Sequence, residues 1–264
     1  MTAPYLHTFA RPGMVLQHTF DAAVVMPTLL RPEIATALRS IFAQDLPGRI
    51  HVVVGVDQPG SLAPVEAACA EMPENCAVQV FWPGYSTSSR HGGVSPARDG
   101  GSLRSILTYL ANALYVAYLD DDNTWRPDHL SSLYRLMPQA DWAFSLRWFC
   151  HPETDRPIRV DEWESVGPGK GVFQQRFGGF VDPNCLMLNK VVCENAIGMW
   201  NQPLAGDPTG MTADRSVFAT LREQYRGMGS GLPTSFYRMN ARDGLHAVRV
   251  AQLGDAYNLA GLVA

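Results

Sequence analysis

The first half of the sequence alternates short apolar runs with stretches of helical spacing, and few folds accommodate that order. Strands are expected at residues 22–26, 50–56 and 78–81, with helices between them at 32–44 and 64–71. The run Ile50–Val56 is apolar throughout, which is typical of a strand buried on both faces of a parallel sheet. We expect Pro27 to end the first strand. The β-α-β-α-β order predicts an α/β fold with a doubly wound, mostly parallel, Rossmann-like sheet.

The remaining elements continue this pattern less regularly. Residues 82–101 are rich in Gly and Ser and predict a long loop, a type of segment that is usually functional or mobile. Helices are expected at 102–113, after Pro127 and at 212–225, and strands at 115–119, 142–149 and 231–239, with loops and short strands over 151–179. No linker interrupts the chain, so residues 1–264 are predicted to form a single continuous domain.

Composition narrows the functional classes. The chain has 21 basic and 25 acidic residues among 264, a net charge of −4, so we expect no nucleic-acid partner. Five cysteines without metal-like spacing indicate reduced thiols, as in a cytoplasmic protein. The sequence shows neither a signal peptide nor a run of the ~20 apolar residues that span a membrane. Peripheral association with a membrane stays open, as does the oligomeric state.

Asp120, Asp121 and Asp122 directly follow the apolar run that ends at Leu119. Ligands of open α/β sheets bind at the carboxyl ends of the strands. Three adjacent carboxylates repel one another unless a cation compensates them, and Mg²⁺ or Mn²⁺ shared with a substrate phosphate would do so. The alternative is that Asp122 or Asn123 caps the next helix, which would explain one of the acids.

Asp57 ends the second strand in the same manner. Its carboxylate could accept hydrogen bonds from a base or ribose. An ordinary Asx turn ahead of Pro59 and Gly60 explains the residue equally well.

Several segments together resemble family 2 glycosyltransferases of the GT-A fold and D-x-D type. The segments are VVMPT (24–28) with RPE (31–33), SPARDG (95–100), and YLDDDNTWRP (118–127). Asp99 stands where that family more often has Asn. The order and spacing match over roughly residues 20–137. The resemblance implies a nucleotide-sugar-binding half at about 20–125 and an acceptor-binding half at about 126–264.

The resemblance also implies roles for individual residues. Pro27 and Thr28 would lie along the nucleotide, Asp57 would contact the base, and Arg98 would lie beside the base or the diphosphate. Asp120 and Asp121 would lie near the nucleotide sugar, while Asp122 would bind a Mn²⁺ or Mg²⁺ ion together with Asp120. A late His246 could approach the same metal. Without the resemblance, Arg98 and His246 are ordinary surface or structural residues.

The family's general base lies at the start of a late helix, a place that Asp214 fills, with Ala213 where Glu is usual. The positive end of the helix dipole would favour the ionised carboxylate. Asp207 is the alternative base, and a purely structural first-turn aspartate is the alternative role.

The resulting expectation is a metal-dependent, inverting glycosyltransferase of the hexosyltransferase type. It would move a sugar from a nucleotide-sugar donor, preferably a UDP-sugar, to a hydroxyl of a glycan or small-molecule acceptor. Two alternatives remain: a nucleotidyltransferase of similar sheet topology, and a non-catalytic module that binds nucleotide sugars or glycans. A nucleotidyltransferase would more typically carry a glycine- and Lys/Arg-rich loop after the first strand, where this chain has Pro27-Thr28-Leu29-Leu30.

Overall fold

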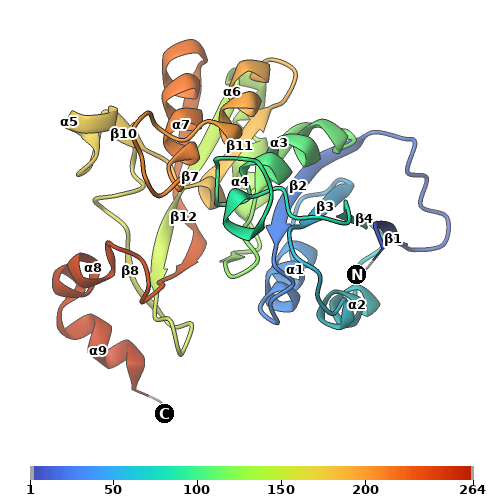
Figure 1. The fold of residues 1–264 in the computed structure, drawn as a ribbon, viewed down its shortest axis with the longest axis horizontal. Coiled ribbons are helices and arrows are strands. Elements are labelled where there is room, and N and C mark those ends of the chain that lie inside the picture. Colours follow the sequence, from blue (N-terminus) through green and yellow to red (C-terminus); the bar gives the residue numbers. More distant parts are fainter. Residues whose placement is uncertain (1–2, 263–264) are drawn as a thin grey trace.

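The computed structural model describes residues 3–262, and a ten-stranded sheet runs through it with helices on both faces (Figure 1). Four parallel strands form the part of the sheet that the first half of the sequence predicts. In spatial order they are β4 (Cys76–Trp82), β3 (Ile50–Val56), β2 (Phe20–Thr28) and β5 (Ala113–Tyr118). The predicted α/β class with a parallel central sheet is therefore confirmed.

Further strands, some of them antiparallel, extend this block on both sides. β1 (Tyr5–Ala10), which the sequence did not predict, pairs with β4 at one edge. Beyond β5 the order is β11 (Leu186–Asn189), β7 (Trp142–Cys150), β12 (Gly227–Arg238) and β6 (Thr124–Trp125). Three short strands remain. β8 (Pro157–Val160) pairs with β7 in the large sheet, and β9 (Gly167–Pro168) and β10 (Gly179–Phe180) form a separate two-stranded sheet. β12 begins at Gly227, before the predicted 231, and runs parallel to β7.

The helices form two layers, which explains why every residue of β3 is buried. One face packs against α1 (Ile34–Phe42), α2 (Ala63–Ala70) and α4 (His129–Tyr134), and the other against α3 (Gly101–Leu110), α6 (Glu194–Gly198) and α7 (Ala213–Gln224). Val52 and Val54 join the first layer's core, while Val53 joins the second. The other helices are α5 (Gln174–Phe177), α8 (His246–Leu253) and α9 (Asp255–Gly261).

Pro27 does not end the first strand, contrary to the prediction. β2 continues to Thr28, and Pro27 lies opposite Gly55 of β3. Pairing with β5 stops at Val25, so the N–H that proline lacks would point past the end of that neighbour. A proline is therefore tolerated in a central strand here. It also lies against Gly100, whose φ of +83° favours glycine, and so brings the Gly/Ser-rich loop to the end of β2.

All five cysteines are buried and none forms a disulfide, as expected for reduced thiols. Among residues 3–262, no helix combines the length and the hydropathy needed to cross a bilayer.

Candidate active site

The predicted site residues Thr28, Asp57 and Asp120–Asp122 meet at one edge of the sheet. β2, β3 and β5 are neighbours and parallel, so their carboxyl ends lie together. Thr28 ends β2, Asp57 directly follows β3, and the turn Asp120–Asn123 follows β5. The structure therefore brings these residues together, and their roles in binding stay a prediction.

Asp120 is held from two sides. Its carboxylate pairs with Arg104 of α3 and accepts a hydrogen bond from Asn184 Nδ2 at 3.0 Å. Its backbone N–H donates to Asn184 Oδ1 at 2.7 Å. The Arg104 guanidinium is buried and also donates to the carbonyl of Asp99. Asp120 thus has a fixed orientation before any ligand binds.

Asp121 fixes the turn to the end of β2. Its side chain is 1% exposed; it accepts hydrogen bonds from Thr28 Oγ1 at 2.6 Å and Leu29 N at 3.4 Å, and pairs with Arg31. Thr28 Oγ1 in turn accepts from the N–H of Leu30, whose φ of +57° is left-handed. Asp121 was predicted to lie along the nucleotide sugar; here its oxygens are used by the protein.

Asp122 has the carboxylate that is best placed to receive a cation. Its side chain is 29% exposed and pairs with Arg31 Nη1 at 3.1 Å. Its pKa is raised to about 6, mainly by burial and also by the charges of Asp120 and Asp121, while Arg31 acts in the opposite direction. Across residues 3–262 no three His, Cys, Asp or Glu side chains gather into a metal-holding group. A metal here would therefore need oxygen ligands from its substrate, as Mg²⁺ in phosphate sites commonly has.

Asp57 is buried, and the Gly/Ser-rich loop uses its carboxylate. It accepts hydrogen bonds from Ser86 Oγ at 2.8 Å, Thr87 N at 2.8 Å and Thr87 Oγ1 at 2.9 Å. Arg98, on the same loop, is exposed, and its Nε lies 3.4 Å from Ser89 Oγ. The structure therefore makes Asp57 an anchor for the loop and leaves the side chain of Arg98 exposed.

Asp214 and Asp207 have opposite environments, which separates the two candidate bases. Burial raises the pKa of Asp214 to about 7, with further contributions from Asp99 and Asp182 and opposition from Arg215. Its side chain remains 20% exposed. The helix-dipole effect that we expected to favour ionisation is thus outweighed by desolvation.

Asp207 is committed to its own loop. Thr209 donates to one carboxylate oxygen through its N–H at 2.9 Å and its hydroxyl at 2.7 Å, and Thr212 Oγ1 donates to the other at 2.8 Å. These hydrogen bonds, led by that of the Thr209 side chain, lower the pKa of Asp207 to about 2. So acidic a carboxyl is a poor base at neutral pH, because the best base has a pKa near the working pH.

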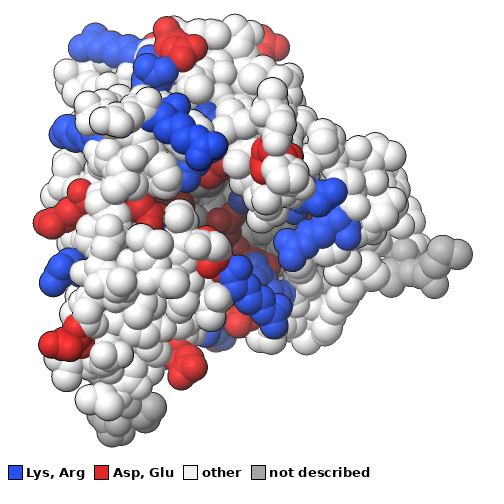
Figure 2. Space-filling model, turned by 60° about the vertical axis from the view of Figure 1, so that its left-hand side comes forward, with Lys and Arg blue, Asp and Glu red and all other residues white. Residues whose placement is uncertain are grey.

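A pocket of about 610 Å³ opens beside the start of α7. Its walls are the Gly/Ser-rich loop and the 201–210 loop, with the lining residues Ser89, Val94, Pro96, Arg98, Asn201, Gln202, Pro203, Leu204, Asp207, Pro208 and Gly210. Figure 2 shows one face of the molecule, on which acidic side chains lie within a hollow and basic side chains lie around it. Such a surface suits a ligand that carries both negative charge and hydroxyl groups.

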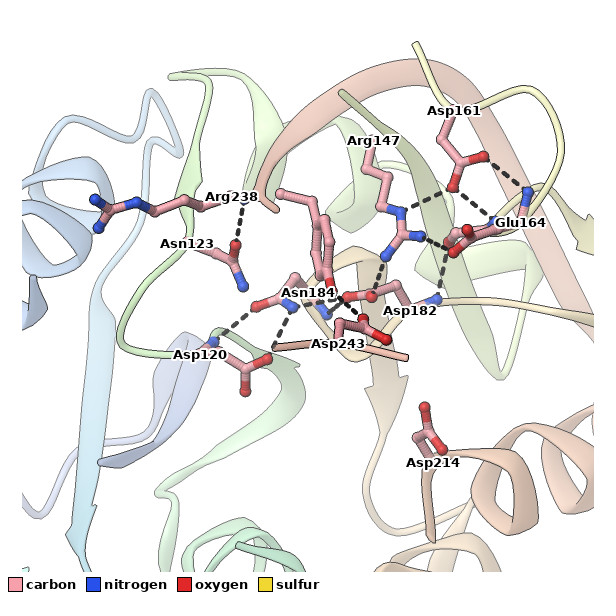
Figure 3. A network of polar contacts seen from close by, with 12 residues as sticks. Asp120, Asn123, Arg147, Asp161, Glu164, Asp182, Asn184, Asp214, Arg238 and Asp243 are labelled. Atoms are coloured by element: carbon pink, nitrogen blue, oxygen red, sulfur yellow. Dashed lines mark hydrogen bonds and ion pairs between the residues drawn. The ribbon is translucent and has the colours of Figure 1, made fainter. Parts of the chain in front are cut away.

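A continuous polar network links Asp120 to the second half of the chain (Figure 3). Asn184 Nδ2 donates to Asp120 and, at 2.7 Å, to Asp182. Asp182 pairs with Arg147, which is 1% exposed. Figure 3 shows Asp214 beside this network without a dashed contact to it.

His246 lies at the start of α8, and its backbone N–H donates to the carbonyl of Asp243 at 2.9 Å. Its ring packs edge-to-face against Tyr257 of α9, with 6.0 Å between ring centroids. Among the contacts that the described residues make, none joins His246 to the Asp120–Asn123 turn. The role of His246 as a metal ligand therefore stays a prediction.

Sequence reasoning missed Arg31, Arg104 and Asn184, the residues that hold the aspartates. Arg31 belongs to a segment that carries the family resemblance, but no role was assigned to it. Asn184 is 64 residues from Asp120 in the chain. Its only local signal is the Asp-Pro-Asn turn that contains it, which does not reveal the partner.

We expect Asn184→Asp to lower the free energy of unfolding by about 1–3 kcal/mol, because it replaces two donors by a charge between two carboxylates. Thermal unfolding at pH 7 measures this effect. Asn195→Asp, at an exposed amide bonded to Gln224, is the matched control and should change little. Equal melting temperatures for the two variants would contradict the role given to Asn184.

Comparison with known proteins places this geometry among glycosyltransferase-like structures. No protein-family model matches the chain. The succinoglycan biosynthesis protein ExoW of Rhizobium meliloti (strain 1021) is 31% identical over 111 residues, which is 40% of this chain and 31% of ExoW.

Two solved structures are similar over most of the chain. TarS 1–349 of S. aureus in complex with UDP-GlcNAc has a TM-score of 0.55 and 14% identity, covering 86% of this chain and 60% of that one. The mannosyltransferase PcManGT of Pyrobaculum calidifontis in complex with GDP-Man and Mn²⁺ has a TM-score of 0.55 and 16% identity, covering 89% and 61%. The chain has the GT-A fold. It spans about three fifths of the length of these two neighbours.

Proposed function

We propose that this GT-A protein is a glycosyltransferase that uses a nucleotide-sugar donor, preferably a UDP-sugar, and a divalent metal. The observations that carry the proposal are two carboxyl groups: partly exposed Asp122 beyond the carboxyl end of β5, and Asp214 in the first turn of α7 with a pKa of about 7. The buried Arg104 lies within electrostatic reach of both regions, because the charges of Asp120 and Asp214 both raise its pKa. The solved neighbours with UDP-GlcNAc, and with GDP-Man and Mn²⁺, support the same class.

The donor would lie along the ends of β2, β3 and β5, in the half at about residues 20–125. Pro27 and Thr28 would line the nucleotide, with Asp57 near the base. Arg98 would donate to the base or diphosphate. Asp120, which is already oriented by Asn184, would lie near the ribose.

Asp122, assisted by Asp120, would hold the metal, because carboxylate oxygens are the ligands that Mg²⁺ and Mn²⁺ prefer. When bound, such an ion would offset the negative charge that grows on the leaving diphosphate. His246 would be a further ligand: its buried Nδ1 has no hydrogen-bond partner among residues 3–262, although no contact joins it to the Asp120–Asn123 turn.

Asp214 would act as the general base. Asp214 is not among the residues that line the pocket between the Gly/Ser-rich loop and the 201–210 loop. The acceptor would bind in the half at about residues 126–264 and extend to the start of α7, where Asp214 would take the proton of its attacking hydroxyl. One base serving one attacking hydroxyl suits a single displacement, which inverts the anomeric centre. A non-catalytic module would not need a carboxyl group whose pKa lies near the working pH.

The test is thermal unfolding with UDP-, GDP- and TDP-sugars, with and without Mn²⁺. At a donor concentration about 100 times Kd, binding adds about 2.7 kcal/mol, or roughly 5–10 °C. We expect this rise for at least one donor, only with Mn²⁺, and its loss in Asp122→Asn but not in the exposed control Asp45→Asn. A rise in melting temperature that persists unchanged in Asp122→Asn would refute the metal–diphosphate assignment. The absence of any rise with every donor would refute the proposed function.

A further inference from the structure

Arg31 is a cation that contacts the acidic turn Asp120–Asn123. Besides holding the aspartates, it has a feature that bears on ligand binding. It lies in the loop between β2 and α1, and its guanidinium reaches Asp121 through Nη2 and Asp122 through Nη1, the latter at 3.1 Å. Its side chain is 45% exposed. It therefore pairs with one buried and one accessible carboxylate while keeping a face open to solvent.

The two carboxylates that Arg31 contacts, Asp121 and Asp122, differ in their other interactions. Asp121 is buried and fixed by Thr28 and by the N–H of Leu29, so it forms a rigid anchor for Nη2. Asp122 has Arg31 as its closest cation, whereas Asp120 has its own buried partner, Arg104. The Asp122 contact can therefore open without breaking the rest of the turn.

We propose that Arg31 is a resident counter-ion that exchanges partners: it pairs with Asp122 in the empty site and with donor phosphate oxygens in the loaded site. This inference rests on the proposed function. A guanidinium remains charged at any working pH, and its planar fork of N–H donors fits carboxylate and phosphate equally well. Anchoring through Asp121 keeps the fork in place during the exchange.

The exchange predicts an order of events at the site. A divalent cation that arrives alone meets a carboxylate already neutralised by Arg31, and the like charges repel. A cation that arrives with a nucleoside diphosphate gives Arg31 a new anionic partner. Binding of the cation and the nucleotide should therefore be cooperative, and Arg31 should be the residue that makes it so.

The test is Mn²⁺ binding followed by electron paramagnetic resonance and calorimetry, with Mn²⁺ alone and with UDP or GDP. We expect Arg31→Gln to bind Mn²⁺ alone about fivefold more tightly than the wild type, since removal of a partly exposed cation is worth up to ~1 kcal/mol. Affinity for the diphosphate should fall by a similar factor, so the cooperativity between the two ligands should weaken and only the part due to their direct contact should remain. Arg31→Lys, which keeps the charge but loses the planar fork, should bind Mn²⁺ alone about as weakly as the wild type and bind the diphosphate less tightly than the wild type.

Arg39→Gln is the matched control, because it breaks an exposed pair with Glu71 on another part of the surface. It should leave both affinities unchanged. Arg31→Ala gives the same readout if the Gln variant does not fold, and circular dichroism checks each variant. Mn²⁺ affinity that is unchanged or weaker in the neutral variants would overturn the counter-ion role alone. Absence of Mn²⁺ binding by the wild type with either diphosphate would overturn the proposed function as well.

Discussion

Replacing Asp214 by Asn is expected to reduce turnover by about 10³-fold while leaving donor binding within a factor of two. General-base catalysis contributes about 10²–10⁴-fold, and the amide keeps the shape of the side chain but cannot accept a proton. Donor binding should survive because Asp214 is not among the residues that hold the Asp120–Asn123 turn. Steady-state kinetics and calorimetric titration with the donor found by thermal unfolding measure the two effects.

The same substitution should change the pH dependence in a defined direction. A base must be ionised, so wild-type activity should rise with pH and reach half its maximum near pH 7, the pKa to which burial raises Asp214. Stability should follow the opposite trend. The unfolded carboxyl loses its proton near its ordinary pKa, while the folded one keeps it until about 7, so stability falls between these values. Asp214→Asn removes that loss and should melt several degrees higher at pH 8.

Asp207→Asn is the discriminating comparison. Its carboxylate is bonded to Thr209 and Thr212 and has a pKa near 2, so the variant should lose stability in its loop and keep the pH profile. A profile that loses its step near pH 7 in Asp207→Asn, and keeps it in Asp214→Asn, would assign the base to Asp207. Full activity of Asp214→Asn would instead favour a non-catalytic role for that residue.

The second large effect concerns folding. Arg147→Met should lower the free energy of unfolding by about 3–5 kcal/mol, which is roughly 10 °C in Tm for a chain of this size. Arg147 is the shared partner of Asp161 at 2.8 Å, Glu164 at 2.8 Å and Asp182, and all four side chains are buried. Its removal leaves three buried carboxylates with too little positive charge.

Arg39→Met is the control with which the loss of stability in Arg147→Met is compared. It removes an exposed pair with Glu71, and exposed pairs are worth about 0–1 kcal/mol. The loss in Arg147→Met should also shrink as the pH falls and the carboxyl groups protonate. A drop in Tm no larger than that of Arg39→Met would show that the network does not stabilise the fold.

The sequence could predict those features that depend on residues near one another in the chain. β3 is apolar at every position because both of its faces are covered, and this pattern is visible without any partner. Asp57, Asp120–Asp122 and Asp214 stand at the ends of strands or the start of a helix, which are local features too. Four-residue β11 was missed because its place between β5 and β7 depends on distant partners.

The missed site residues share that cause. Asn184 and Arg104 are ordinary residues within their own segments, and only the fold brings them to Asp120. The raised pKa of Asp214 has the same origin, since desolvation by the surrounding chain produces it. Pro27 was misjudged because its effect depends on where the neighbouring strand stops.

The contacts of Asn184 also bear on how such a chain can be recombined. The carboxylate of Asp120 would serve the proposed donor half, yet its orientation depends on the side-chain amide of Asn184, which lies in the proposed acceptor half. Trp125 Nε1, in the proposed donor half, donates to the backbone carbonyl of the same Asn184 at 2.8 Å. A chimera that exchanges one half between two relatives would separate these partners. If the proposed function holds, donor preference and acceptor preference should therefore be inherited together, unless residues 182–185 are exchanged along with the Asp120–Asn123 turn.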